Sequence, residues 1–459
     1  MSEAGLAQAV KKMEDAGVSS AAISVFSHYY RVLEHGHSSF IPEETISPLT
    51  SVDRLEDNQV SPQQAQAALA KTVMIKLNGG LGTSMGMDKA KSLLPVRSGL
   101  TFLDIICRQV MAARKEYGIS LPLIFMDSFR TQADTLAALQ NHPGIEVAGL
   151  PLDFLQNQEP KLRADDLTPV AWDQDPSLEW CPPGHGDIYT ALYGSGLLDK
   201  LIAAGYRYAM TSNSDNWGAT PNAEIAGWFA ASGAPYAAEL CIRTINDRKG
   251  GHLAIRKADG QLILRDTAQT PPEQMDYFTD EHRHPFFHTN NLWFDLVKLR
   301  DALTENNAVL GLPLIANHKT VDPSDAESPA VIQMETAMGA AIASFKGATA
   351  ILVPRSRFLP VKTTNELTLV RSDIYELGDD YHLRKVNDQE VEVDLDSHFF
   401  KKIADFEARF SAGVPSLREA KRFKVTGPFT FGKDVKVTGQ VSLETSAEKQ
   451  VAAGSHLAG

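Results

Sequence analysis

The chain has 459 residues, of which 43% are hydrophobic and 22% are charged, and it carries a net charge of −13 at pH 7. This composition is typical of a globular protein large enough for two or three domains. The acidic balance argues against nucleic acid or an anionic membrane surface as the main partner. Three widely spaced cysteines fit a reducing compartment, and the N-terminal residues lack the basic and apolar regions of a secretory signal. We therefore expect a cytoplasmic protein.

The N-terminal part is predicted to be helical. Two helices are expected within residues 5–34, separated near Gly17. Residues 41–60 contain two prolines and scattered charges, which indicates an extended connection. Ser61 followed by proline favours the start of a short helix. We assign residues 1–65 to an N-terminal helical segment.

The next stretch is the most informative part of the sequence. Residues 73–77 form an apolar run typical of a buried strand. Four glycines and two lysines follow it: Gly79, Gly80, Gly82, Gly86, Lys89 and Lys91. Glycines leave backbone N–H groups uncovered, so such a loop can present amide donors to phosphate oxygens, and the lysines add positive charge.

The spacing of these glycines excludes two common motifs. A P-loop requires lysine directly after its last glycine, whereas Gly86 is followed by Met87. The dinucleotide fingerprint is excluded as well, because Gly80-x-Gly82-x-x-x-Gly86 is one residue too long. At this point a phosphate-binding loop and a plain glycine turn are equal alternatives.

From this strand onward, strands and helices alternate. Further strands are expected at residues 121–126, 145–150, 206–211, 235–242, 287–294 and 348–353. Helices are expected at residues 100–117, 131–140, 189–204, 222–232, 295–303 and 331–345. A hairpin at residues 251–265 interrupts the series. The pattern predicts an α/β fold with a mixed, mostly parallel sheet over residues 66–360, and ligands bound beyond the carboxyl ends of its strands.

The C-terminal part, residues 361–459, differs from the rest. The tetrapeptide Lys-Val-Thr-Gly at residues 424–427 recurs at residues 436–439, with apolar residues around both copies. This repeat indicates either a fragment of a β-solenoid or a β-meander packed on its own chain. Two solenoid coils are too few to bury a continuous core, so this part would lean on the preceding α/β domain or on a second subunit.

Three polar stretches lie at expected strand or helix ends and could form a site. Gln156 has an amide that could pair with the edge of a base, although a polar loop is the simpler reading. Gly184 and His185 lie in a rigid and then flexible turn, whose alternative role is to cap a helix through Asp187. Asp215 is a hard oxygen ligand suited to Mg²⁺ shared with phosphates, or the start of an Asx-turn.

Two later stretches add groups for a sugar and for anions. Asn290 and Asn291 are adjacent amides suited to sugar hydroxyls. Arg355, Arg357 and Lys362 follow a strong strand and predict a local anion site in an acidic protein. A solvated basic loop is the alternative.

Taken together, these stretches resemble the eukaryotic-type UDP-glucose pyrophosphorylases, or UTP–glucose-1-phosphate uridylyltransferases. The shared motifs include Leu-Asn-Gly-Gly-Leu-Gly-Thr-x-Met-Gly, Pro-Pro-Gly-His-Gly-Asp, Ser-Asn-x-Asp-Asn, Thr-Asn-Asn-Leu-Trp and Val-Pro-Arg-Ser-Arg-Phe-Leu-Pro-Val-Lys-Thr-Thr-Asn, in the order of the family. The resemblance implies a Rossmann-like nucleotidyltransferase domain and a C-terminal left-handed β-helix, which could join a homo-oligomer. It implies Mg²⁺-dependent, reversible transfer of a uridylyl group from UTP to glucose 1-phosphate. A pyrophosphorylase for galactose or N-acetylglucosamine 1-phosphate is the alternative.

The resemblance also implies roles for individual residues. Those near the nucleotide would be Leu77, Gly79, Gly80, Lys91, Gln156, Gly184 and Asp215, with Gln156 and Gly184 reading the uracil and Asp215 holding Mg²⁺. Those near the sugar phosphate would be His185, Asn213, Glu239, Gly251, Asn290 and Lys362. Catalysis would rest on Lys91, Lys362 and Asp215.

Three departures from the family pattern are visible. Lys89 stands where the family has glycine, which leaves open whether Lys89 or Lys91 contacts phosphate. Arg243 replaces a family lysine, which keeps the charge but changes its geometry. Cys181 stands where the family often has histidine. None of these changes removes a group that the chemistry requires.

Overall fold

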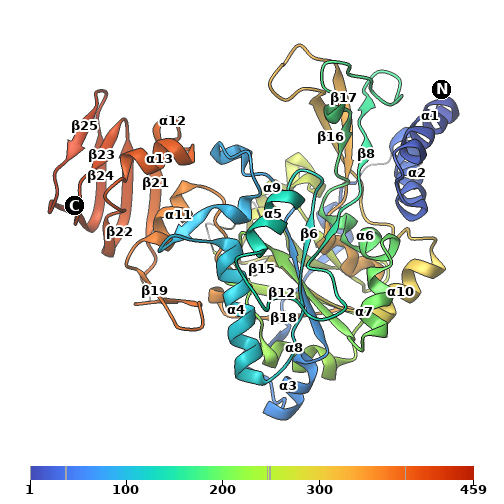
Figure 1. The fold of residues 1–459 in the computed structure, drawn as a ribbon, viewed down its shortest axis with the longest axis horizontal. Coiled ribbons are helices and arrows are strands. Elements are labelled where there is room, and N and C mark those ends of the chain that lie inside the picture. The colour runs from blue at the N-terminus through green and yellow to red at the C-terminus, as the bar shows by residue number, and fades with distance from the viewer. Residues whose placement is uncertain (1, 37–38, 245–246, 248–249, 388) are drawn as a thin grey trace.

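The computed structural model describes every residue except 1, 37–38, 245–246, 248–249 and 388. A central mixed sheet with helices on both faces forms the body of the molecule. The C-terminal sheets form a lobe at one end, and the N-terminal helices lie at the other end (Figure 1).

The central sheet has eight strands in the order β2-β18-β12-β15-β11-β3-β6-β7. These strands are β2 (Asp53–Arg54), β3 (Thr72–Leu77), β6 (Leu123–Asp127), β7 (Asp153–Leu155), β11 (Tyr208–Asn213), β12 (Tyr236–Ile242), β15 (Phe286–Asp295) and β18 (Thr349–Leu352). Neighbouring strands are parallel except where β15 pairs with β11 and β12. The predicted mixed, mostly parallel sheet is confirmed.

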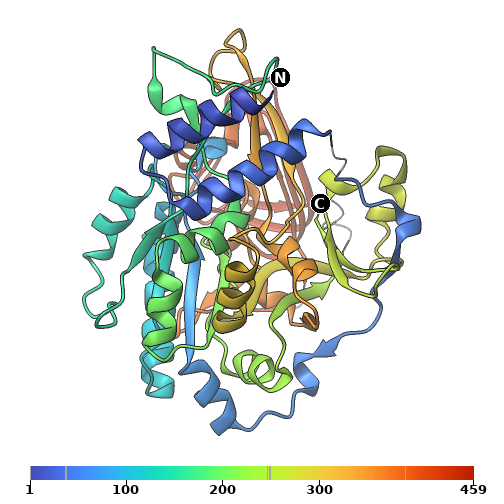
Figure 2. The same ribbon diagram turned by 90° about the vertical axis from the view of Figure 1, so that its right-hand side faces the viewer.

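Helices cover both faces of this sheet, and the last three helices of the chain pack in the C-terminal lobe instead. In chain order the helices are α1 (Ser2–Asp15), α2 (Ser20–Glu34), α3 (Pro62–Leu69), α4 (Phe102–Tyr117), α5 (Gln132–Leu139), α6 (Ile188–Gly194), α7 (Leu197–Ala203), α8 (Ala223–Ser232), α9 (Met275–Thr279), α10 (Leu296–Glu305), α11 (Thr364–Arg371), α12 (Ser397–Phe400) and α13 (Ile403–Arg409). One apolar core joins the sheet to α6, α7 and α10, and a second joins it to α3, α4 and α8. Figure 2 shows α1 and α2 side by side at the N-terminal end of the molecule, where α2 packs on α6.

Smaller sheets surround the central one. The hairpin strands β13 (His252–Arg256) and β14 (Leu262–Arg265) form a sheet with β1 (Ile46–Pro48), as the hairpin pattern predicted in part. A second sheet contains β16 (Ile315–Thr320), β17 (Ala330–Glu335) and β9 (Leu162–Arg163). Three two-stranded ribbons complete this region: β4 (Pro95–Arg97) with β5 (Leu100–Thr101), β8 (Glu159–Pro160) with β10 (Trp180–Cys181), and β19 (Tyr375–Leu377) with β20 (Leu383–Lys385).

From residue 392 onward, the strands of the C-terminal part are all paired in parallel. One sheet has the order β21 (Glu392–Leu395), β22 (Ser416–Thr426), β24 (Lys436–Glu444), β26 (His456–Ala458), and the other pairs β23 (Phe429–Phe431) with β25 (Lys449–Val451). A meander would instead pair consecutive strands antiparallel. Their core also contains Phe102 and Trp217 from the part that carries the central sheet, so this lobe leans on the rest of the chain, one of the two arrangements expected.

Three predicted elements are wrong. The helix expected at residues 331–345 is strand β17 followed by a short 3₁₀ segment, Met338–Ser344, because β17 pairs with β16, a polar strand that the pattern did not reveal. The strand expected at residues 145–150 lies instead at β7, beyond Gly149, whose φ is 83°. The helix expected at residues 189–204 is divided into α6 and α7 by Gly196, whose φ is 74°.

The three cysteines lie in different elements and are free thiols. Cys107 is in α4, Cys181 in β10 and Cys241 in β12, and all three are buried. Burial raises the pKa of Cys107 and Cys241 to about 12. Within the described part of the chain, no helix has the length and apolar character needed to cross a membrane.

Candidate active site

The glycine loop leaves the carboxyl end of β3 and folds back on itself. Leu81 forms an isolated antiparallel bridge with Ala90. The backbone N–H of Lys91 donates to the carbonyl of Gly80, with an N–O distance of 3.1 Å. The turn within the loop uses Gly86, whose φ is 74°. This closure returns Lys91 to the end of the strand, whereas Lys89 is exposed.

Two lysines meet one buried carboxylate beside this loop. The ammonium of Lys91 lies 2.7 Å from Oδ2 of Asp215, and that of Lys362 lies 3.4 Å from the same oxygen. Burial alone would raise the pKa of Asp215, but the charges of Lys362 and Lys91 hold it below its ordinary value. Oδ1 of Asp215 is buried and has no hydrogen-bond partner among the described residues. The lysine side chains are 19% (Lys91) and 54% (Lys362) exposed, so Lys362 is the more accessible cation.

The segment that carries Lys362 is attached to the end of β11. The N–H of Val361 donates to the carbonyl of Asp215 at 3.1 Å. Asn216 forms a bridge with Pro360, and its Oδ1 accepts from the N–H of Leu359 at 2.8 Å. Lys362 is thereby fixed beside Asp215, although the two lie 147 positions apart.

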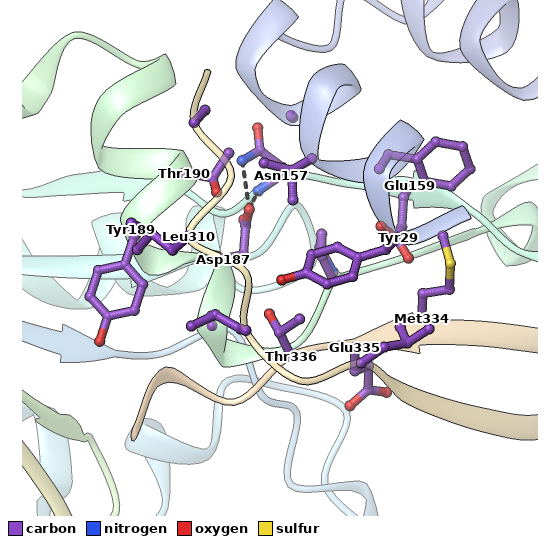
Figure 3. A pocket seen from close by; sticks show the side chains of 18 of the residues that line it. Tyr29, Asn157, Glu159, Asp187, Tyr189, Thr190, Leu310, Met334, Glu335 and Thr336 are labelled. Carbon is purple, nitrogen blue, oxygen red and sulfur yellow. Dashed lines mark hydrogen bonds between the residues drawn. The ribbon is translucent and has the colours of Figure 1, made fainter. Parts of the chain in front are cut away.

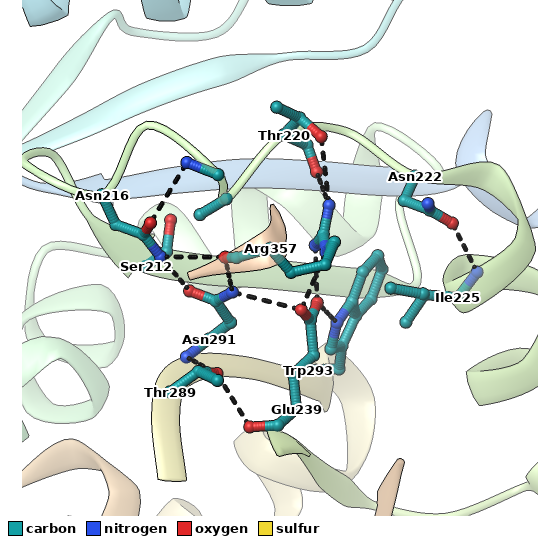
Figure 4. A network of polar contacts seen from close by, with 12 residues as sticks. Ser212, Asn216, Thr220, Asn222, Ile225, Glu239, Thr289, Asn291, Trp293 and Arg357 are labelled. Carbon is teal, nitrogen blue, oxygen red and sulfur yellow. Dashed lines mark hydrogen bonds and ion pairs between the residues drawn. The ribbon is translucent and has the colours of Figure 1, made fainter. Parts of the chain in front are cut away.

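The two arginines of the same segment do not belong to an anion site, contrary to the prediction. Arg357 is buried and pairs with Glu239, with a shortest N–O distance of 2.7 Å (Figure 4). Arg355 makes a two-pronged ion pair with Asp247 at 2.7 and 2.8 Å. Their charges are used within the protein, so Lys362 is the cation of this segment that faces the pocket.

A pocket with an empty volume of about 630 Å³ opens next to Lys362. It is lined by His185, Asn213, Gly251, Leu264, Asp266, Phe287, His288, Thr289, Asn290, Ala337, Phe358 and Lys362. Five of the six residues predicted to lie near the sugar phosphate are in this set. The structure therefore brings together groups from five separate parts of the chain.

The amides of this pocket are held by strand geometry. Nδ2 of Asn290 donates to Oδ1 of Asn213 at 3.3 Å, which links β15 to β11. Asn290 has a φ of 63°, a left-handed conformation that asparagine tolerates better than most residues. It lies where the pairing of β12 with β15 shifts register, and such irregularities redirect side chains.

Glu239 is the sixth predicted residue, and it is not part of the pocket lining. It is fully buried in β12, where Arg357, Trp293 and Asn291 occupy its carboxylate oxygens. The carboxylate in the pocket lining is that of Asp266, which the sequence analysis missed. Asp266 directly follows β14 and lies in no recognisable motif; only its position at the end of a predicted hairpin strand could have marked it.

His185 is held in one tautomer at the mouth of the pocket. Its Nδ1 accepts from the N–H of Met338 at 3.0 Å, so in the neutral ring the proton is on Nε2. Neighbouring protein atoms and the charge of Lys362 lower the pKa of His185, although the residue is exposed. His185 is therefore a neutral N–H donor at pH 7.

The other residues predicted for the nucleoside do not line this pocket. A Cβ on Gly79 would lie 2.8 Å from Nε2 of Gln156, so the glycine allows the Gln156 amide to approach the loop. Gly80 faces open space. Gly184 has a φ of 77°, and a Cβ there would lie 2.6 Å from the carbonyl of Thr336. The carbonyl of Leu77 accepts from Ser214, which ties β3 to the segment before Asp215.

A second cavity lies beside Gly186 (Figure 3). Its empty volume is about 550 Å³, and it extends from Gly186 to Tyr29 of α2. Asp187 faces it and accepts from the backbone N–H and from Nδ2 of Asn157, at 2.6 and 2.8 Å. Asp187 accepts no capping bond from α6, so it braces the Gln156 loop instead. Burial raises its pKa to about 7.

Beside the two lysines, the carboxylate of Asp215 is the group that could bind a metal ion. Among the described residues no group of three or more His, Cys, Asp or Glu side chains could hold a metal ion. The single carboxylate of Asp215, with its unpartnered oxygen, suits Mg²⁺, which usually keeps waters and substrate phosphates as its other ligands.

A glycine loop, two lysines and a buried carboxylate at the carboxyl ends of parallel strands define a protein that binds a phosphorylated nucleotide. A family model described as UTP–glucose-1-phosphate uridylyltransferase matches residues 23–438. The chain belongs to this family.

Curated relatives and solved structures agree with this assignment. The UTP–glucose-1-phosphate uridylyltransferase of Hordeum vulgare is 38% identical over 452 residues, which cover 96% of this chain and 92% of the relative. That of Saccharomyces cerevisiae is 38% identical over 401 residues, 86% of this chain and 78% of the relative. A crystal structure of a variant UDP-glucose pyrophosphorylase from Leishmania major in complex with UDP-glucose matches with a TM-score of 0.93 and 42% identity, over 100% of this chain and 99% of the other.

Proposed function

We propose that this chain transfers the uridylyl group of UTP to glucose 1-phosphate and forms UDP-glucose and pyrophosphate. The observation that carries the proposal is the meeting of Lys91, Asp215 and Lys362 at the boundary between a glycine loop and a polar, sugar-sized pocket. The names of the relatives support UTP and glucose 1-phosphate as the substrates, and they do not favour another hexose.

The chemistry needs positioned cations rather than a general base. A phosphate oxygen of glucose 1-phosphate is already anionic, and it attacks the α-phosphorus of UTP. A new P–O bond forms there while the bond between the α-phosphorus and the bridging oxygen breaks, and that oxygen leaves with pyrophosphate. Lys91 and Lys362 hold the two anions together and neutralise the charge that develops in the transition state. Nε2–H of His185 donates to an oxygen of the sugar phosphate.

Mg²⁺ is part of this proposal. Oδ1 of Asp215 would hold it, and the bound ion would neutralise charge on the triphosphate. The unpartnered oxygen fits this role. In calorimetric titrations of Mg²⁺ into enzyme with UTP but no sugar phosphate, Asp215→Asn should weaken binding about tenfold or more, the scale known for groups that merely support a metal ligand. Asp295→Asn, at the other end of the sheet, should leave Mg²⁺ binding unchanged, and undisturbed binding in Asp215→Asn would exclude Asp215 as a ligand.

The remaining residues take the roles that the pocket allows. On the nucleoside side these are Leu77, Gly79 and Gly80 with Gln156 and Gly184 at the uracil; on the sugar side they are Asn213, Gly251, Asn290 and the unforeseen Asp266. Carboxylates and amides accept and donate hydrogen bonds to hydroxyl groups, which suits a hexose. Glu239 would support these residues indirectly, through its hydrogen bonds with Asn291 and Arg357.

The proposal is tested by measuring pyrophosphate release from UTP in the presence of glucose, galactose or N-acetylglucosamine 1-phosphate. We expect turnover to be fastest with glucose 1-phosphate and abolished by EDTA. Faster turnover with galactose or N-acetylglucosamine 1-phosphate would favour the alternative substrate. No pyrophosphate release with any of the three would exclude the proposed function.

We further propose that residues 361–459 form the β-helix implied by the resemblance. The chain passes in turn from β22 to β23, β24, β25 and β26, and these strands alternate between two parallel sheets, which supports a coil. The domain boundaries at residues 65 and 360 stay predictions. The formation of a homo-oligomer through this lobe stays a prediction as well. Light scattering of the full chain and of a chain ending at residue 411 would measure the latter.

A further inference from the structure

A buried ion pair lies directly beneath the candidate site. Arg357 reaches Glu239 of β12 through two hydrogen bonds, Nη2 to Oε1 at 2.7 Å and Nε to Oε2 at 2.9 Å. The side chains are only 6% and 0% exposed. Neither lines the pocket, so neither charge is available to a substrate.

The pair is fully satisfied by its surroundings. Nη1 of Arg357 donates to the carbonyl of Thr220 at 2.7 Å, and Glu239 accepts from Trp293 at 2.9 Å and from Asn291 at 3.1 Å (Figure 4). Burying two charges requires removing them from water, and two apolar residues of similar volume often stabilise a fold equally well. Stability alone therefore does not explain an ion pair at this position.

The orientation of Arg357 is transmitted to the catalytic groups by the backbone. Its carbonyl accepts from Nδ2 of Asn216 and from Nδ2 of Asn291, both at 3.2 Å. The next residues continue the attachment, because Leu359 bonds to Asn216 and Val361 bonds to Asp215. Arg357, Leu359 and Val361 are thus each hydrogen-bonded to Asp215 or to Asn216 beside it.

We propose that Arg357 and Glu239 are positioning residues that set the separation of Lys362 from Asp215. The inference rests on the proposed function, since that separation matters only where Lys362 and Asp215 act on the same phosphates. A displacement of about 1 Å in a catalytic group can lower a rate about a hundredfold. The two-pronged geometry requires arginine, because lysine offers a point charge on a flexible stem.

The test separates positioning from stability by removing one or both charges. Arg357→Met leaves the Glu239 carboxylate buried and unpaired, so we expect a lower Tm and a lower kcat. The double variant Glu239→Leu with Arg357→Met removes both charges and should regain most of the lost Tm. Its kcat should stay at least about tenfold below that of the wild type, with a raised Mg²⁺ requirement and little change in the KM for UTP. A double variant with wild-type kcat would overturn the proposal.

Two further variants complete the test. Arg357→Lys keeps the charge and should fold, with a kcat reduced about tenfold; an unchanged kcat there would also overturn the proposal if the double variant fails to fold. Arg207→Met is the control for the loss of an arginine–carboxylate pair away from the site, because the partly exposed Arg207 pairs at 2.8 Å with the buried Asp295, where β11 begins and β15 ends. We expect it to lower Tm but not kcat. Wild-type enzyme that makes no UDP-glucose in the same assay would instead refute the proposed function.

Discussion

On the side of the site that we propose for the phosphates, two ammonium groups lie within 3.4 Å of one buried carboxylate, whereas on the side that we propose for the nucleobase the walls are glycine backbone and the neutral amide of Gln156. In the proposed reaction, the first arrangement would stabilise the charge that develops in the transition state. The second offers fixed shape and neutral hydrogen bonds. The comparison teaches that turnover and nucleotide selection should respond to separate sets of mutations.

The largest expected effect is on the phosphate side. Lys362→Ala removes a preorganised cation, and we expect kcat to fall about a hundredfold or more, the scale known for losing one such donor. The KM for UTP should change far less. Steady-state kinetics with saturating Mg²⁺ measures both parameters. Lys89→Ala is the control on the exposed part of the glycine loop, and an unchanged kcat in Lys362→Ala would remove Lys362 from the mechanism.

On the nucleobase side, Gly184→Ala should act mainly on binding. An alanine there would have to adopt a φ of 77° with its Cβ 2.6 Å from the carbonyl of Thr336. Strain of this kind amounts to about 1–3 kcal/mol, so we expect the KM for UTP to rise about tenfold or more with kcat reduced less. Gly233→Ala, at a positive φ with open space around it, controls for the backbone strain alone. A change confined to kcat would contradict the division between the two sides.

A smaller effect is expected from Gln156→Leu. The substitution keeps the volume beside Gly79 but removes the amide, so kcat/KM for UTP should fall about fivefold, the scale of one net hydrogen bond. The preference for UTP over CTP should narrow, while kcat at saturation stays near wild type. Equal losses for both nucleotides would show that Gln156 supports the loop without reading the base.

The smallest effects concern stability and have opposite signs for two buried ionisable side chains, those of Lys76 and Asp187. Burial lowers the pKa of Lys76 in β3 from 10.5 to about 7, so its buried charge destabilises the fold fully below pH 7, and this loss is relieved as the pH rises toward 10.5. Burial raises the pKa of Asp187 from 3.8 to about 7, so its destabilisation is absent below pH 4 and complete above pH 7.

Thermal unfolding of two variants between pH 4 and pH 10 measures how each group changes the stability of the fold with pH. The Tm of Lys76→Met relative to wild type should be highest at low pH and decline above pH 7. The relative Tm of Asp187→Asn should increase from pH 4 to pH 7. Lys11→Met, on an exposed side chain of α1, should show no such trend. If the relative Tm of Lys76→Met and that of Asp187→Asn changed with pH in the same direction, the opposite pKa shifts of Lys76 and Asp187 would be contradicted.

Much of the site was predictable because its groups follow strand ends. The glycine loop and Asp215 come directly after apolar runs, and parallel strands bring their carboxyl ends to one edge. The roles of Arg355 and Arg357 were not predictable in this way. Their partners, Asp247 and Glu239, lie 108 and 118 positions away, and composition alone cannot distinguish a paired buried arginine from one that binds phosphate.

The errors in the fold have a similar origin. The residues that became β17 are apolar enough for a helix or a strand, and pairing with β16 decided between them. Asp266 was missed because the end of a hairpin strand carries no local signal of what it will face. Long-range pairing, rather than local pattern, settled each of these cases.

The three buried cysteines can be used to detect local opening of the structure around each of them. A thiol with its pKa raised by burial has almost no reactive thiolate at neutral pH. Alkylation of Cys107, Cys181 or Cys241 therefore requires the surrounding element to open first. Because the three residues lie in α4, β10 and β12, the rates at which each is alkylated would time the opening of three regions separately, with no introduced label.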